Sequence, residues 1–87
     1  MSFQLRYYKK AEKQLSKLDA KQSQIIVAWL MKNIDGCDNP RSFGSALTAN
    51  HKHKWRYRIG DYRVLVDIQD ETLIILAIQI GHRRDVY

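Results

Sequence analysis

The sequence has few of the features that crosslink a small protein or direct its export. Only one of its 87 residues is cysteine, so no internal disulfide can form, whereas small secreted scaffolds usually carry several disulfide pairs. The N-terminal segment MSFQLRYYKKAEK lacks the apolar core of a signal peptide. The longest apolar runs, Ile25–Met31 and Leu73–Ile78, are far shorter than the roughly 18 residues of a membrane-spanning helix. These absences predict a protein of the reducing cytoplasm with no membrane partner.

Acidic residues are also scarce. Nine Asp and Glu stand against 15 Lys and Arg, which gives a formal net charge of +6 at pH 7. A small soluble domain this basic commonly binds nucleic acid or an acidic protein, although a basic surface can also serve solubility alone. Hydrophobic residues make up 45% of the chain, enough for a folded core. The length fits one unit, so residues 1–87 are expected to form a single domain.

Hydrophobic periodicity predicts an α+β fold in the order β-α-α-β-β-β. Phe3–Tyr7 alternates like a strand, and Lys9–Leu18 has the spacing of an amphipathic helix. A second helix is expected to begin after Asp19 and to end at Gly36. Asp19 can be its N-cap, and Gln22, three residues later, completes a capping-box pattern. The residues of its predicted core stripe are Ile26, Trp29, Leu30 and Ile34, with Ile25 in support.

The rest of the chain predicts a loop followed by three strands. Asp35–Asn50 is rich in turn formers, so we expect a loop with one short ordered segment. Lys54–Ile59 and Tyr62–Gln69 both alternate around Gly60-Asp61, the signal of a two-residue hairpin turn. Thr72–Ile80 is nearly all apolar, as in an interior strand covered by helices. The prediction is a helical hairpin packed on a mainly antiparallel sheet.

The predicted hairpin separates apolar from basic side chains. With Gly60-Asp61 as the turn, Arg58 pairs with Arg63, and alternation sends the apolar residues to the opposite face. The basic face then holds Lys54, Arg56, Arg58 and Arg63. Like charges directly opposite each other destabilise a strand pair by a few tenths to about 1 kcal/mol. The arrangement therefore favours an anionic ligand such as polyphosphate, and the alternative is a solvated edge that guards against aggregation.

The chain has two further groups of polar residues. The C-terminal segment Gly81–Tyr87 adds a second cationic group whose path the sequence does not fix. His51 and His53 lie two residues apart, but no carboxylate or cysteine close to them completes a set of metal ligands. The sequence therefore predicts neither a metal nor a cofactor.

The chain resembles the RelE/ParE family of toxins from prokaryotic type II toxin–antitoxin modules, and more closely its RelE branch. The resemblance rests on the order of elements and on Leu15–Leu18, Gly44–Leu47, Trp55–Val64 and Gly81–Tyr87. It implies a RelE-like fold and a metal-independent endoribonuclease that cuts messenger RNA in the ribosomal A site by 2′-OH attack and so inhibits translation. It also implies a cognate antitoxin as partner. Whether their complex binds operator DNA through the antitoxin stays open.

The resemblance also implies the site residues. It places catalytic roles on Lys54, Arg56, Arg63, Arg83 and Tyr87, and on His82, where some relatives have a catalytic histidine or lysine. The other basic residues predicted to contact RNA are Lys52, Arg58 and Arg84. At the position of Arg56 the best-known branch commonly has lysine. Because a guanidinium has a pKa above about 12, Arg56 can stabilise charge but cannot shuttle protons. Proton transfer then falls to Lys54, His82, Tyr87 or groups on the ribosome.

Three other functions stay open at this stage. A ParE-like toxin would act on DNA gyrase without cutting RNA. A basic RNA-binding module would bind without forming a cyclic phosphate product, and an inactive toxin would not arrest growth.

Overall fold

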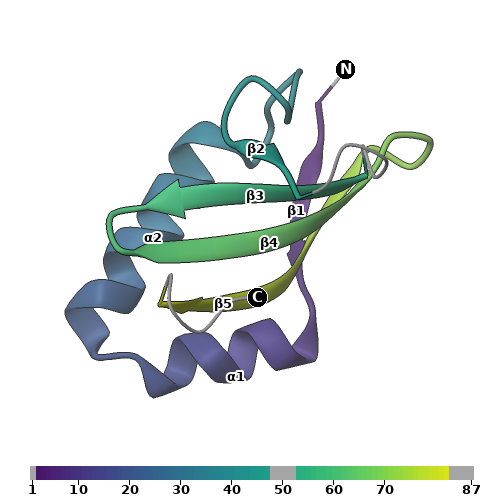
Figure 1. The fold of residues 1–87 in the computed structure, drawn as a ribbon. Helices are drawn as coiled ribbons and strands as arrows, with labels where there is room; N and C mark the ends of the chain where they lie inside the picture. The colour runs from purple at the N-terminus through teal and green to yellow at the C-terminus, as the bar shows by residue number, and fades with distance from the viewer. Residues whose placement is uncertain (1, 48–52, 83–87) are drawn as a thin grey trace.

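The computed structural model describes residues 2–47 and 53–82, and it confirms an α+β fold with two helices on a five-stranded sheet. The elements are β1 (Gln4–Tyr7), α1 (Lys9–Lys17), α2 (Ala20–Asn33), β2 (Ser45–Ala46), β3 (Lys54–Ile59), β4 (Tyr62–Gln69) and β5 (Ile74–His82). The sheet order is β1-β5-β4-β3-β2, and only the β1–β5 pair is parallel. Figure 1 shows α2 behind the sheet and α1 along the side of β5. The short ordered segment predicted between Asp35 and Asn50 is β2, which extends the sheet beyond β3.

The helix ends follow from their capping residues. Leu18 is the C-cap of α1, and its backbone N–H donates a hydrogen bond to the Leu15 carbonyl. The Asp19 carboxylate accepts from the backbone N–H of Gln22 at 2.9 Å, as predicted for the N-cap of α2. Gly36, with a φ of +81°, lies in the left-handed region just past α2. Neither helix within the described residues is long and apolar enough to cross a membrane.

The β3–β4 hairpin has the predicted register. Ile59 pairs with Tyr62 and Arg58 with Arg63 around the turn. Gly60 has a φ of +60°, as the first central residue of a type II′ turn requires.

Strand β5 lies two residues further along the chain than Thr72–Ile80, the predicted range. Leu73 has a φ of +56°, so the turn after β4 includes Thr72 and Leu73 and the strand begins at Ile74. At its other end β5 extends to His82, because it pairs with β4 as far as Tyr62.

The core lies between the helices and one face of the sheet. The helices contribute Ala11, Ile26, Leu30 and, at the end of α2, Ile34, all fully buried. Each fully buried Ile or Leu side chain contributes about 1.5–3 kcal/mol relative to an exposed one. The sheet contributes Tyr57, Ile59, Val64, Val66, Ile68, Ile75, Ala77 and Ile80.

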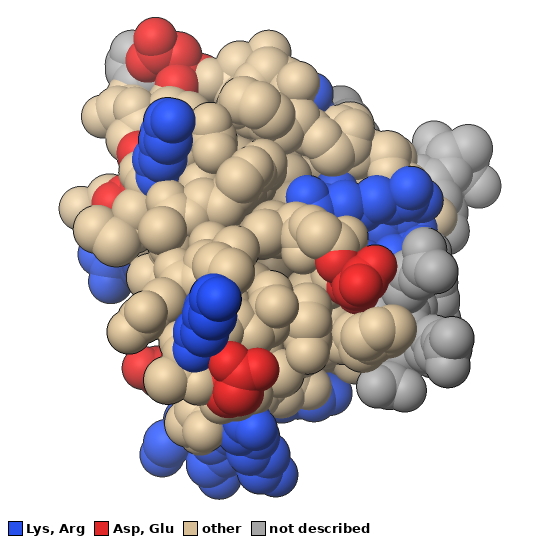
Figure 2. All heavy atoms as spheres, turned by 90° about the vertical axis from the view of Figure 1, so that its left-hand side faces the viewer, with Lys and Arg blue, Asp and Glu red and all other residues tan. Residues whose placement is uncertain are grey.

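The predicted core stripe of α2 is only partly correct. Trp29 is half-buried against the core, and Ile25, expected to support the stripe, is 48% exposed. The helix therefore has more apolar side chains than the core uses. Seen from the side of the molecule at the left of Figure 1, residues other than Lys, Arg, Asp and Glu cover much of the surface between separate charged side chains (Figure 2).

The segment after α2 lies along the outer edge of β1. Phe3 makes two backbone hydrogen bonds with this segment: its N–H donates to the Cys37 carbonyl, and its carbonyl accepts from the Gly36 N–H, both at 2.8 Å. The Leu5 N–H donates to the Asp35 carboxylate at 3.1 Å. These bonds satisfy outward-facing backbone groups of an edge strand.

Candidate nucleic-acid interface

Basic side chains of β3 and β4 lie in neighbouring rows on the sheet face opposite the core, called here the open face. The first row is Arg58, Arg63 and Gly81, paired directly across β3, β4 and β5. Residues paired in this way have side chains on the same face. The flanking Tyr57, Ile59 and Val64 are buried on the other face, which confirms the predicted separation of apolar and basic residues.

Arg56 lies in the next row and is held from the edge of the sheet. Its Nη2 donates to the Ser45 hydroxyl oxygen on β2 at 3.0 Å. The row continues through Leu65 and Gln79, so the open face is not purely basic towards β5. Ser45 is a site residue that the sequence does not reveal, because a strand of two residues gives no alternation from which to read its pairing.

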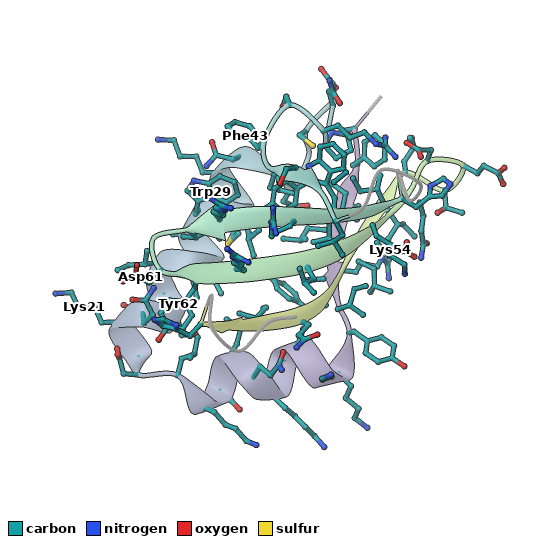
Figure 3. The ribbon with its side chains drawn as sticks, viewed as in Figure 1. Lys21, Trp29, Phe43, Lys54, Asp61 and Tyr62 are labelled. Carbon is teal, nitrogen blue, oxygen red and sulfur yellow. The ribbon has the colours of Figure 1, made fainter. Side chains whose placement is uncertain are left out.

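Lys54 lies at the far end of β3 from the turn. It pairs with Asp67 across the strands, and its Nζ is 3.5 Å from a carboxylate oxygen of Asp67. Figure 3 shows Lys54 at one end of the hairpin and Asp61 and Tyr62 at the other. At about 3.3 Å per strand residue, Lys54 is separated from the Arg58–Arg63 row by more than 10 Å along the strand. The structure therefore does not bring all the predicted catalytic residues together.

A small hollow adjoins the arginine row at the turn. It has a volume of about 90 Å³ and is lined by Arg58, Gly60, Tyr62 and Arg63. The Nε and Nη1 atoms of Arg63 are shielded from solvent, as is Nε of Arg56. An anion near partly desolvated guanidinium groups is held more strongly than in open water, because the local dielectric is lower. The chemistry of this hollow suits a phosphate group.

His82 does not lie with the arginines. It pairs with Tyr62, and their rings are in edge contact with centroids 5.6 Å apart. Since side chains alternate along β5, His82 projects from the same face as Tyr62, beside α1, and Gly81 occupies the open face. The sequence placed His82 in the catalytic set, and the structure places it across the sheet from Arg63.

Four predicted site residues lie outside the described residues: Lys52, Arg83, Arg84 and Tyr87. Their roles stay predictions.

A larger open cleft of about 870 Å³ lies at the Lys54 end of the hairpin. Arg41 pairs there with Asp70 through two bonds of 2.9 and 3.0 Å, and Asp67 and Glu71 add two more carboxylates. Because three carboxylates line this cleft, it is less suited to RNA phosphate than the smaller hollow beside Arg63.

The structure offers little to a metal ion in its described parts. Within residues 2–47 and 53–82, no three His, Cys, Asp or Glu side chains gather as a metal-binding group. Burial is the main cause that raises the pKa of the Cys37 thiol, so this thiol stays protonated at neutral pH and is a poor ligand.

Comparison with known proteins gives a family and a fold. The model of the family described as the ParE toxin of the type II toxin–antitoxin system parDE matches residues 5–87. No curated protein matches.

Solved structures share the fold at low sequence identity. A toxin–antitoxin complex, RelBE2 from Mycobacterium tuberculosis, contains a chain that is 24% identical with a TM-score of 0.82, over 98% of this chain and 95% of that one. The archaeal RelE–RelB complex from Pyrococcus horikoshii is 17% identical with a TM-score of 0.70, over 99% and 100%. A mutant of Escherichia coli RelE in the free state is 15% identical with a TM-score of 0.72, over 94% and 84%.

Proposed function

This chain belongs to the ParE toxin family of type II toxin–antitoxin systems, and we propose that it arrests translation by cutting messenger RNA in the ribosomal A site. The observation that carries the proposal is the row of Arg58 and Arg63, with Arg56 beside it, on a sheet face that the helices leave open. A pair of like charges across two strands costs stability, and a phosphate bound between them removes that cost. The resemblance to the RelE branch supports the choice of RNA as substrate, and RelE structures share the fold.

The reaction that fits these residues is phosphoryl transfer within the RNA. The 2′-oxygen forms a bond to the adjacent phosphorus, and the bond from phosphorus to the 5′-oxygen of the next nucleotide breaks. The 2′-OH proton passes to a base and an acid protonates the leaving oxygen, which gives a 2′,3′-cyclic phosphate and a 5′-OH. Arg63 and Arg56 stabilise the charge that develops on the equatorial phosphate oxygens.

Proton transfer is the less defined part of the mechanism. His82 projects from the opposite face to Arg63, so the proposal does not use it as the acid. Lys54, Tyr87 and groups on the ribosome are the remaining donors and acceptors. With so few groups available, an in-line geometry imposed by the ribosome supplies a large part of the rate.

The first prediction tests the charge-stabilising role of Arg63. We expect Arg63→Ala to lower the cleavage rate about 100-fold or more, the cost of removing a donor to a developing oxyanion. The matched control is Arg6→Ala, which removes the same charge from the open face two strands away on β1 and leaves the rate within about threefold. The measurement is cleavage mapping on a defined messenger in a translation extract, with detection of the cyclic phosphate end.

Inhibition of DNA gyrase without RNA cleavage is the second candidate, and the family's name favours it. Intact messenger together with inhibited DNA supercoiling in the same extract would establish that function instead. Binding to ribosomes with neither effect would indicate a non-catalytic module.

A further inference from the structure

Helix α2 carries apolar side chains that the core does not use. The run Ile25–Met31 is apolar throughout, but only Ile26 and Leu30 of this run are buried. Ile25 is 48% exposed and Met31 62% exposed, and they lie on different sides of the helix because they are six residues apart. Apolar side chains left at the surface in this way mark a contact with something outside the fold when they join a hollow.

Such a hollow is lined in part by Trp29 of α2, and Ile25 is closer than Met31 to the side of α2 on which Trp29 lies. Ile25 lies one turn before Trp29 on the same side of α2. Trp29 meets the ring of Phe43 edge-on, with centroids 5.5 Å apart, and Phe43 is itself 40% exposed. Figure 3 shows Trp29 and Phe43 close together at the edge of the molecule, one from α2 and one from the loop before β2. The hollow has a volume of about 450 Å³ and is lined by Trp29, Phe43, Gly44, Ser45 and Arg58. We call Ile25, Trp29, Phe43 and this hollow the α2 groove.

Basic side chains border the α2 groove. Lys21 lies one turn before Ile25, and Lys32 lies three residues after Trp29, so both are on or next to the same stripe of α2. Arg58 borders the hollow from β3. The groove therefore combines an apolar floor with a cationic rim. Figure 2 views the molecule from the side on which Lys21, Trp29 and Phe43 lie in Figure 3.

This combination fits a peptide better than an RNA base. An apolar strip that runs for a helical turn and ends in an aromatic-lined hollow accepts the spaced apolar side chains of an amphipathic segment. Aromatic anchors in such hollows dominate the binding energy of protein interfaces, and a charged rim selects the partner. A nucleotide would not use the aliphatic Ile25.

We propose that the α2 groove docks an acidic, amphipathic segment of the cognate antitoxin. One apolar side chain of that segment fills the hollow between Trp29 and Arg58, and its carboxylates pair with the basic rim. Membership of a toxin–antitoxin family supplies the partner, and the net charge of +6 supplies the complementarity. The groove is a second contact area, separate from the open face.

Arg58 connects the two areas. It lines both the α2 groove and the small hollow beside Arg63. An antitoxin carboxylate paired with Arg58 thus makes this guanidinium less available to the proposed phosphate site. The antitoxin's apolar side chain in the hollow holds the segment in place. The docking does not rest on RNA cleavage, because the antitoxin partner follows from the family.

The test compares three single substitutions on purified toxin. The probe is the labelled antitoxin from the neighbouring reading frame, and the measurement is Kd by fluorescence anisotropy. We expect Phe43→Ala and Ile25→Ser each to raise Kd about 10- to 100-fold. Met31→Ser, which removes an even more exposed apolar side chain from a different side of α2, should leave Kd within about twofold. Thermal unfolding of each variant confirms that it is folded.

Three results would overturn the proposal. They are an unchanged Kd for either Phe43→Ala or Ile25→Ser, equal losses in all three variants, and weaker binding to ribosomes instead of to the antitoxin. If the wild type cuts no RNA but the antitoxin results stand, the proposed function is wrong and the docking site is not.

Discussion

At the scale of single residues, Gly44 determines how closely the loop after α2 approaches β3. Its φ is +75°, and a Cβ at this position would collide with the Arg56 carbonyl oxygen and lie 2.9 Å from the Tyr57 ring. The next residue, Ser45, holds the guanidinium of Arg56. Glycine therefore serves both the packing of the loop and the geometry of the open face.

The second prediction concerns this close approach. We expect Gly44→Ala to lower the free energy of unfolding by about 2–4 kcal/mol, as the sum of left-handed strain and overpacking. Gly36→Ala is the matched control, because Gly36 also has a positive φ of +81° but no atom lies within 4 Å of its added Cβ. Gly36→Ala should lower the free energy of unfolding by the left-handed strain alone, about 1–2 kcal/mol. Urea unfolding measures both, and equal losses would contradict the close approach.

At the scale of elements, Tyr57 connects β3 to the segment after α2 through a hydrogen bond. Its hydroxyl donates to the Pro40 carbonyl at 2.5 Å from inside the core, and its ring packs against Trp29. Burial is the main cause that raises the pKa of Tyr57 well above its usual value near 10, and a smaller contribution comes from Cys37. The neutral phenol is thus the form that the folded state requires.

The third prediction follows from the direction of that shift. Because the folded pKa is raised, this contribution to stability is complete below about pH 10 and declines as pH rises further. We expect Tyr57→Phe to cost about 1–3 kcal/mol at neutral pH, since the Pro40 carbonyl loses its donor. The difference from wild type should shrink above about pH 10.

Urea unfolding at several pH values checks this third prediction. Tyr8→Phe is its control, because Tyr8 is 54% exposed; we expect a change within about 0.5 kcal/mol. A gap between wild type and Tyr57→Phe that grows with pH would refute the argument.

Elements with strong local signals were predictable from the sequence, and those set by distant contacts were not. The β3–β4 register followed from alternation around Gly60-Asp61, and with it the common face of Arg56, Arg58 and Arg63. The parallel pairing of β1 with β5 depends on contacts far apart in sequence, and β2 has only two residues, too few to show alternation. The start of β5 was misplaced because Leu73 takes a left-handed conformation that apolar patterning cannot reveal.

The face on which His82 lies illustrates the same limit within the candidate site. A strand has a period of two, so one residue decides between the core face and the open face. Without the pairing of β5 to β4, the sequence could not assign Gly81 to the open face and His82 to the face beside α1.

At the scale of the whole molecule, the net charge of +6 has two parts with different expected roles. The arginines of β3 and β4 lie in rows on one face, whereas α1 carries its lysines exposed at the surface. Only the first part is proposed to contact RNA.

The fourth prediction separates these parts by salt dependence. Arg58→Ala and Lys13→Ala each remove one positive charge, from the open face and from α1 respectively. We expect Arg58→Ala to weaken binding to messenger-programmed ribosomes and to reduce the slope of log Kd against log salt by about 1. Lys13→Ala should leave that slope unchanged. Equal slopes for the two variants would mean that bulk charge, and not the arginine row, drives binding.

The bonds along β1 also affect what the free chain can do. Backbone groups of Phe3 and Leu5 are engaged by Asp35, Gly36 and Cys37, and the opposite edge of the sheet is β2, a strand of two residues. Long open edges recruit further strands and start aggregation, and these two edges offer little to recruit. The β1 edge of a copy that has lost its antitoxin is therefore a poor template for pairing with other copies.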